Sequence, residues 1–139
     1  MRITRLKISL FTFVFVLLFT SIAAAQNAQD ARHIEVSLRM IGHQVLLNSN
    51  DSISRVLPIV KENDRYKIVF ESEFDFKPEE LVATFDRIVK ETGIAKSYIV
   101  EVEACETREV VYIFEMGYTE KANIIPCGGR DVPKSCYSI

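Results

Sequence analysis

The sequence predicts an α+β domain in which two helices lie on one face of an antiparallel sheet of about four strands. Two stretches place apolar residues at every third or fourth position, and two pairs of stretches are rich in β-prone residues. A connection of turn length joins the members of each pair, as in hairpins. The order helix, hairpin, helix, hairpin and Cys-rich C-terminal tail favours an α+β sandwich over a parallel α/β sheet.

The first 25 residues have the pattern of a signal peptide or signal anchor. Three basic residues precede 18 uncharged ones, Ile8 to Ala25, which end in three alanines. A cationic start, an apolar centre and small residues at the end are typical of a cleaved signal, so we expect cleavage after Ala25. Because 18 residues is also the lower limit for a bilayer span, an uncleaved membrane anchor through residues 8–25 is the alternative. Either outcome exports the rest of the chain to the periplasm or to the extracytoplasmic face of the inner membrane.

Size and charge indicate a single acidic domain over residues 26–139. Removing Arg2, Arg5 and Lys7 leaves 17 − 3 = 14 basic residues against 19 acidic ones, a net charge of −5. The 114 remaining residues suffice for one core and are too few for two. The negative charge argues against direct nucleic-acid binding by this chain.

The first predicted helix covers residues 31–48, where apolar residues recur at spacings of four, three and four. The polar run Asn48–Ser52 ends it, because such side chains satisfy backbone groups better outside a helix. Two β-rich segments follow, residues 55–60 and 66–72, with a polar connection of hairpin length between them. Pro58 places the first of these segments at an edge or makes it irregular. The apolar helix positions are Ile34, Leu38, Ile41 and Val45.

The second predicted helix starts in the run Lys77-Pro-Glu-Glu. Pro78 suits the first helical position, the two glutamates complement the positive end of the helix dipole, and Gly93 suits the C-terminal stop. A second hairpin follows, with strands at residues 97–104 and 109–116. The apolar stripe of the helix consists of Leu81, Phe85, Ile88 and Val89.

Three cysteines, Cys105, Cys127 and Cys136, lie in a chain that has left the reducing cytosol. An odd number there favours one bridge and one further thiol. Two glycines and a proline between Cys127 and Cys136 allow the backbone to turn back, so we favour this bridge. Closing so short a loop would raise the free energy of unfolding by about 2 to 3 kcal/mol. Cys105 is then the candidate free thiol, either a small buried side chain or a redox-active group.

The turn Gly128-Gly129-Arg130 is the candidate ligand or partner contact. Glycine-rich turns can direct backbone amides at an anion, and a guanidinium adds a positive charge. A plain structural turn inside a disulfide loop is the favoured alternative, because glycines serve tight turns generally.

The sequence contains no recognisable catalytic or metal-binding pattern. His33 and His43, the only histidines, both lie on the first predicted helix, and no nucleophile signature accompanies a cysteine. The cysteine spacings lack the paired knuckles of zinc sites. A cluster of glutamates near the second hairpin is better explained as a solvated strand face than as a cation site. We therefore predict no enzymatic activity, no metal and no cofactor. The clustered residues are Glu101, Glu103, Glu106 and Glu109.

Several stretches of the mature chain carry a family resemblance. The most specific is the tail Pro126-Cys-Gly-Gly-Arg-Asp-Val-Pro-Lys-Ser-Cys136, together with the single cysteine of the second hairpin. These stretches resemble the extracytoplasmic N-terminal domain of membrane-anchored winged-helix transcriptional regulators of Bacteroidetes-type bacteria. The remaining stretches are residues 38–47, 51–55, 70–76, 98–100 and 104–106.

The resemblance implies a periplasmic domain that senses a small molecule or a protein, and it adds Arg55 to the candidate contact residues. Regulators of this kind continue into a second membrane segment and a DNA-binding domain, which the 139 residues do not include. We therefore expect a non-enzymatic sensor or interaction module, either free-standing or part of a longer regulator. The alternative is a small secreted or periplasmic disulfide-bonded binding protein unrelated to transcription.

Overall fold

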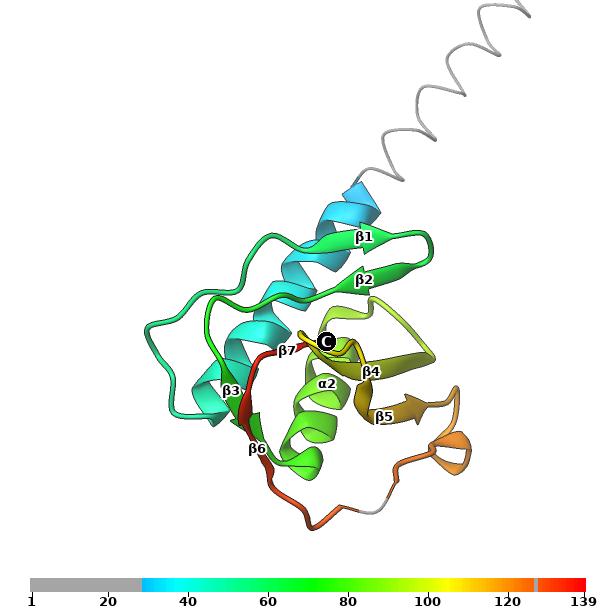
Figure 1. Ribbon diagram of the computed structural model, residues 1–139. Helices are drawn as coiled ribbons and strands as arrows, with labels where there is room; N and C mark the ends of the chain where they lie inside the picture. The colour runs from blue at the N-terminus through cyan, green and yellow to red at the C-terminus, as the bar shows by residue number, and fades with distance from the viewer. Residues whose placement is uncertain (1–28, 127) are drawn as a thin grey trace, which may run out of the picture. The chain divides into compact units, whose positions relative to one another are not determined.

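The computed structural model describes residues 29–126 and 128–139 (Figure 1). The chain divides into two compact units, residues 1–34 and residues 35–139, and the fold below is that of the second unit. Of the first unit only residues 29–34 are described, and they are helical. The predicted signal, residues 1–25, lies outside the described residues. Within the described ranges no helix combines the length and the apolar character needed to cross a membrane.

Two helices form where the sequence predicts them. The first continues to residue 48, and its end is shaped by Asn50, whose positive φ of 61° lets the N–H of Asp51 donate to the carbonyl of Leu46. The second, α2 (Pro78–Thr92), starts at the predicted proline. It ends at Gly93, whose left-handed backbone (φ 68°) directs its N–H to the carbonyl oxygen of Val89.

The second predicted hairpin is also confirmed. Its strands are β4 (Tyr98–Ala104) and β5 (Val110–Met116), which pair antiparallel with Val100 opposite Phe114. A register shift follows Val102. The side chains that the two strands bury face the helices.

The other strands are short, and the described strands fall into three small sheets instead of one. The first predicted hairpin is reduced to β1 and β2, and it continues as single bridges such as Val56 with Phe70. Three strands and a short 3-10 helix, η1, were not predicted, because they have only two to four residues each. The bounds are β1 (Val60–Glu62), β2 (Arg65–Lys67), β3 (Phe74–Phe76), η1 (Glu120–Ala122), β6 (Val132–Ser135) and β7 (Tyr137–Ser138).

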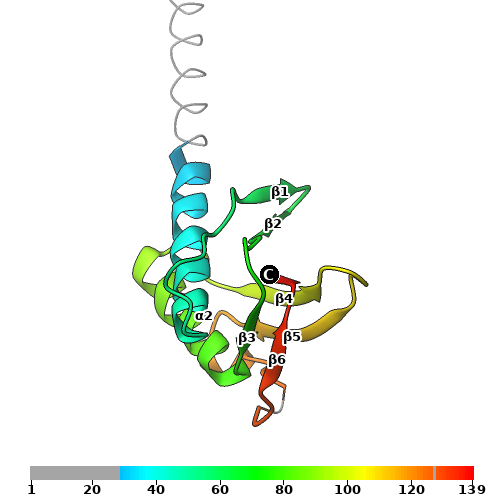
Figure 2. The same cartoon turned by 60° about the vertical axis from the view of Figure 1, so that its left-hand side comes forward.

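The C-terminal strand β7 links the two hairpins. Ser138 faces Glu103 of β4 on one side and forms a bridge with Val69 on the other. Ile68 and Ile139 exchange two backbone hydrogen bonds, of 2.6 and 3.1 Å. In Figures 1 and 2, β7 enters between β2 and β4 and ends there. The last residues of the chain are therefore a shared element of two sheet fragments.

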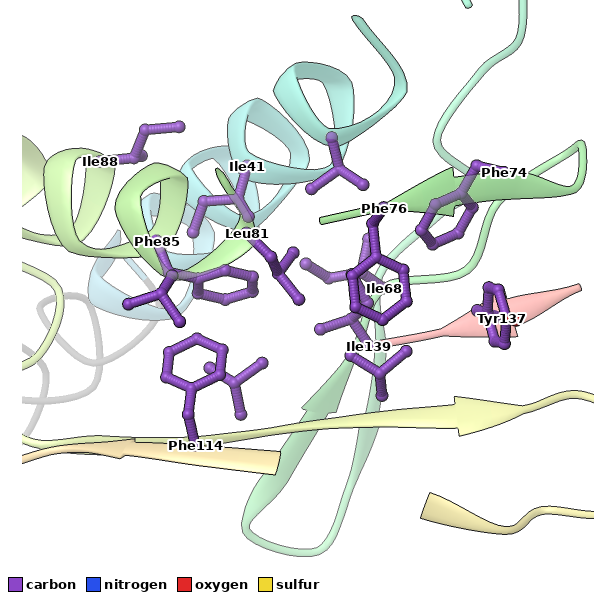
Figure 3. Packing of buried hydrophobic residues seen from close by; sticks show 14 of the residues in the cluster. Ile41, Ile68, Phe74, Phe76, Leu81, Phe85, Ile88, Phe114, Tyr137 and Ile139 are labelled. Carbon is purple, nitrogen blue, oxygen red and sulfur yellow. The ribbon is translucent and has the colours of Figure 1, made fainter. Parts of the chain in front are cut away.

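The core lies between the helices and the strands. Figure 2 shows the first helix and α2 on the same side of β4 and β5, as predicted. Figure 3 shows side chains from both helices meeting those from the middle of the chain, such as Phe74, and from its C-terminal end, such as Tyr137, in one cluster. Several aromatic rings contact one another within it: Phe85 meets Phe114 edge to face at 5.8 Å between ring centroids, and Tyr137 meets Phe74 at 5.6 Å. The α+β class and its helix positions thus agree with the sequence prediction.

Candidate functional site

The disulfide joins Cys105 to Cys136, with Cα atoms 5.4 Å apart, so the predicted Cys127–Cys136 bridge and the free thiol at Cys105 are both wrong. The cause is strand pairing. Ala104 faces Tyr137 in the ladder of β4 and β7, and the N–H of Cys105 donates to the carbonyl of Cys136 at 3.0 Å. Adjacent ladder positions bring two cysteines within bridging distance whatever their separation along the chain. Position 127 lies outside the described residues.

The Gly128-Gly129-Arg130 turn does bind a carboxylate, but this carboxylate belongs to a side chain of the same protein. The N–H of Gly129 donates to the Glu79 carboxylate in the first turn of α2. A Cβ at Gly128 would collide with that carboxylate, so the close approach requires glycine. The amide of Gly129 is thus used internally, and the turn is structural in this respect. Arg130 itself is exposed.

Arg55 is a surface residue paired with Glu71. Its guanidinium lies 3.1 Å from the carboxylate, and the two side chains are 80% and 41% exposed. The hydrogen bond from Arg55 lowers the pKa of Glu71, and the same contact raises the pKa of Arg55. An ion pair this exposed contributes little to stability. Among the described residues, no hydrogen bond or ion pair joins Arg55 to the Gly128–Arg130 turn.

The structure places a pocket between the end of the first helix and the start of α2, with a volume of about 100 Å³. Its floor is apolar, and its rim carries amides and both signs of charge. An apolar floor with convergent polar groups is a feature of small-molecule sites, although these usually enclose more space, about 300–1,000 Å³. The floor residues are Val45, Phe76 and Leu81, and the rim residues are Asn48, Asn50, Asp75, Lys77 and Glu80.

A chain of side-chain hydrogen bonds fixes one wall of this pocket. The amide of Gln44 donates to Asn48 at 2.9 Å, and the amide of Asn48 donates to the hydroxyl of Thr84 on α2 at 3.1 Å. Thr84 is buried. Because the bond from Asn48 to Thr84 crosses from the first helix to α2, it holds the Asn48 amide at the pocket rim. An open groove lined by these residues and by Arg87 adjoins the pocket.

The opposite wall carries charge at the N-terminal end of α2. The Nζ atom of Lys77, the residue before the helix, lies 3.3 Å from Oε1 of Glu80. The Lys77 side chain forms no capping hydrogen bond with the helix. Asp75 lines the same pocket. The contact with Glu80 raises the pKa of Lys77, so the ammonium stays charged at neutral pH. A ligand entering here meets a cation and two carboxylates within one small volume.

The sequence does not predict the pocket, although four of its eight lining residues stand in two runs whose local structure it does predict. The run Asn48–Ser52 was interpreted as a helix end and Lys77–Glu80 as a helix start. Both interpretations are correct for local structure. Nothing in the sequence indicates that the end of one helix lies beside the start of the other.

The remaining candidates from the sequence do not assemble into a site. Glu101 and Glu103 pair with Arg65 and Lys67 of β2, at 2.6 and 2.9 Å. Across the described residues, no group of three or more histidine, cysteine, aspartate or glutamate side chains is placed to hold a metal ion. His43 is exposed on the first helix.

Comparison with protein-family models, with curated proteins and with solved structures finds no significant match to this chain. The resemblance to extracytoplasmic regulator domains therefore stays a prediction. The disulfide is compatible with the oxidising compartment that the N-terminal pattern predicts.

Proposed function

We propose that this chain is a non-enzymatic sensor or interaction module on the extracytoplasmic side of a membrane, and that its signal is a small ligand bound in the pocket between the two helices. The observation that carries the proposal is the pocket itself, with its apolar floor and its rim of amides and opposite charges. The family resemblance of the sequence supports the same function.

The pocket chemistry favours a small ligand that carries both a negative and a positive group. Lys77 offers an ammonium to a carboxylate, and Glu80 and Asp75 offer carboxylates to an amine. The Asn48 amide, oriented by Thr84, supplies a directional hydrogen bond. A volume of about 100 Å³ limits the part of the ligand that is enclosed to a few heavy atoms. An α-amino acid is the simplest compound of this description.

Titration of the isotope-labelled protein with a panel of α-amino acids, followed by the amide NMR signals, tests the proposal. We expect saturable shifts confined to residues 44–50 and 75–84. Glu80→Gln should weaken binding about 10-fold, because it removes one charge-assisted hydrogen bond. Glu73→Gln, a change of the same kind at an exposed residue outside the pocket, should leave binding unchanged. Shifts elsewhere, no binding across the panel, or turnover of a bound compound would contradict the proposal.

The cellular location requires a separate measurement. Intact-mass analysis of protein recovered from membrane and soluble fractions, without reduction, distinguishes a processed periplasmic module from an anchored sensor. Loss of residues 1–25 in the soluble fraction would indicate cleavage, and full-length chain in the membrane fraction would indicate an anchor. Recovery of the unprocessed chain from the cytosol would contradict an extracytoplasmic function.

A further inference from the structure

The pocket between the helices continues into a groove of about 550 Å³ that is open to solvent. Asn48 and Glu80 line both spaces, so they stand at the boundary between them. The pocket alone, at about 100 Å³, encloses only a few heavy atoms. A compound whose polar end lies in the pocket therefore extends directly into the groove. The other residues that line the groove are Gln44, Ala83, Thr84 and Arg87.

The two helices form the walls of this groove. Gln44 and Asn48 lie about one turn apart on the first helix, and the α2 residues recur at every third or fourth position, which places them on one face. The Asn48 amide donates to the Thr84 hydroxyl at 3.1 Å, so a hydrogen bond joins the two walls at the boundary with the pocket. Figures 1 and 2 show the end of the first helix beside α2. Helices that bond to each other, and not loops, therefore position the groups that a ligand meets.

The charged side chains along α2 alternate in sign from the pocket into the groove. Lys77 and Glu80 lie in the pocket, with Nζ of the lysine 3.3 Å from Oε1 of the glutamate. Arg87 lies in the groove, two helical turns beyond Glu80, or roughly 10 Å along the helix axis. Ala83 and Thr84, which line the groove between them, are uncharged. The order is therefore cation, anion, cation.

Arg87 is able to bind a carboxylate of a ligand. Its guanidinium lies 3.5 Å from the carboxylate of Glu91, one turn further along α2, and the two side chains are 50% and 56% exposed. An ion pair as exposed as this contributes little, so a second carboxylate can compete for the guanidinium. The planar guanidinium has five N–H donors, which suit bidentate binding of a carboxylate. The groove thus has a cationic site at a distance from the pocket.

We propose that the ligand is an acidic α-amino acid, which places its α-amino and α-carboxylate groups in the pocket and its side-chain carboxylate at Arg87 in the groove. This inference rests on the proposed function, because it specifies the ligand of the same pocket. The charges of such a ligand match those of α2 in order: the α-carboxylate faces Lys77, the ammonium faces Glu80, and the second carboxylate faces Arg87.

The length and the polarity of the groove narrow the choice of side chain. Glutamate has one methylene more than aspartate, so its second carboxylate reaches further toward Arg87 across the uncharged part of the groove. A basic side chain would bring a like charge to Arg87, which disfavours it. An apolar side chain would gain little, because the groove is open to solvent and most of its lining residues are polar. Glutamate is therefore the expected ligand among the common α-amino acids.

The affinities of glutamate and glutamine for the full chain test this inference, because the two ligands differ only in the charge at the end of the side chain. The wild-type protein should bind glutamate about 10-fold more tightly than glutamine, since the bond to Arg87 is charge-assisted. In NMR titrations both ligands should shift the amide signals of residues 44–50 and 75–84. Glutamate alone should shift the side-chain Nε–H signal of Arg87.

Two variants determine whether Arg87 is the source of this selectivity. Arg87→Gln should bring the ratio of the two affinities close to 1 and leave the affinity for glutamine unchanged. Lys90→Gln removes the same charge from the same helix at a residue that lines neither the pocket nor the groove, so it should keep the ratio of about 10. Arg87→Glu should reverse the preference, so that lysine binds more tightly than glutamate.

The possible failures of this experiment are distinguishable. Equal affinity of the wild-type protein for glutamate and glutamine, or an equal loss of selectivity in Arg87→Gln and Lys90→Gln, would overturn this inference alone and leave the pocket as an amino-acid site. A shift of the Arg87 Nε–H signal that is the same with both ligands would also overturn it. Binding of no amino acid at all would overturn the proposed function and this inference with it.

Discussion

The β4–β5 hairpin and the C-terminal arm, residues 128–139, are two kinds of β-structure in one small domain. The hairpin pairs two strands of seven residues that a short turn connects. The arm pairs β6 with β3, about 60 residues earlier, and β7 with β4, about 35 residues earlier. Its strands contain only four and two residues. The hairpin is therefore defined by local sequence, and the arm by its distant partners.

This difference means that interactions other than ladder hydrogen bonds must stabilise the arm. A strand of two residues has too few ladder bonds to offset the entropy of closing a long loop. The arm is held instead by the disulfide, by Tyr137 among the phenylalanines, and by Ile139, which is buried against Ile68. Removing any of these anchors should disturb the arm more than the hairpin.

The largest expected effect is that of Tyr137→Ala. The ring is 5% exposed and meets Phe74 and Phe76 at 5.6 and 5.7 Å, and its hydroxyl donates to the carbonyl of Pro133 at 2.8 Å. The free energy of unfolding, measured with chemical denaturant, should fall by about 3 to 5 kcal/mol. Tyr118→Ala, at a residue 72% exposed, is the control and should change it by less than about 0.5 kcal/mol. Similar losses in both variants would contradict the role of Tyr137 as an anchor.

Loss of the disulfide should rank next. The double variant Cys105→Ser with Cys136→Ser opens a loop of sequence separation 31, worth roughly 3 to 4 kcal/mol in the chain-entropy account. A reducing agent should lower the stability of the wild-type protein by a similar amount and leave that of the double variant unchanged. Peptide mapping without reduction should recover residues 105 and 136 in one linked fragment. A fragment linking residues 127 and 136 would contradict the pairing.

The smallest effect concerns Tyr98 at the start of the hairpin. Its hydroxyl is buried and has no hydrogen-bond partner among the described residues. Burial, together with the smaller effect of the Asp86 charge, raises the pKa of Tyr98 to about 12. Because no bond is lost, Tyr98→Phe should leave the stability at pH 7 unchanged or raise it by up to about 1 kcal/mol.

The pH dependence of Tyr98 has a definite sign. In the unfolded chain its hydroxyl ionises near pH 10, and in the folded protein only near 12. Between these values the unfolded state binds fewer protons, so stability falls as pH rises. Thermal unfolding of the two proteins between pH 9 and 12 should show a smaller fall for Tyr98→Phe. Parallel curves would contradict the raised pKa.

The sequence was a good guide to the elements whose signals are local. Pro78 and Gly93 mark the two ends of α2, and the alternation in residues 97–116 marks the long hairpin. It failed for the arm, because a strand as short as Tyr137–Ser138 has no periodicity to recognise. The disulfide was misassigned for the same reason, since the approach of Cys105 to Cys136 is set by the pairing of β4 with β7.

The candidate site could not be predicted from the sequence, for a related reason. Asn48 and Lys77 each have a correct local interpretation, and only the packing of the two helices brings them to one pocket.

Amide hydrogen exchange of the protein with its disulfide intact and with it reduced tests most directly whether distant partners hold the C-terminal arm. With the disulfide intact, the account predicts slow exchange at Ile68, Ile139 and Val100, whose N–H groups are bonded within ladders. Reduction of the Cys105–Cys136 bond should speed exchange at Ile68 and Ile139, which bond to each other, and should leave exchange at Val100 in the β4–β5 hairpin unchanged. Equal acceleration at all three amides, or none at any of them, would contradict this account of the arm.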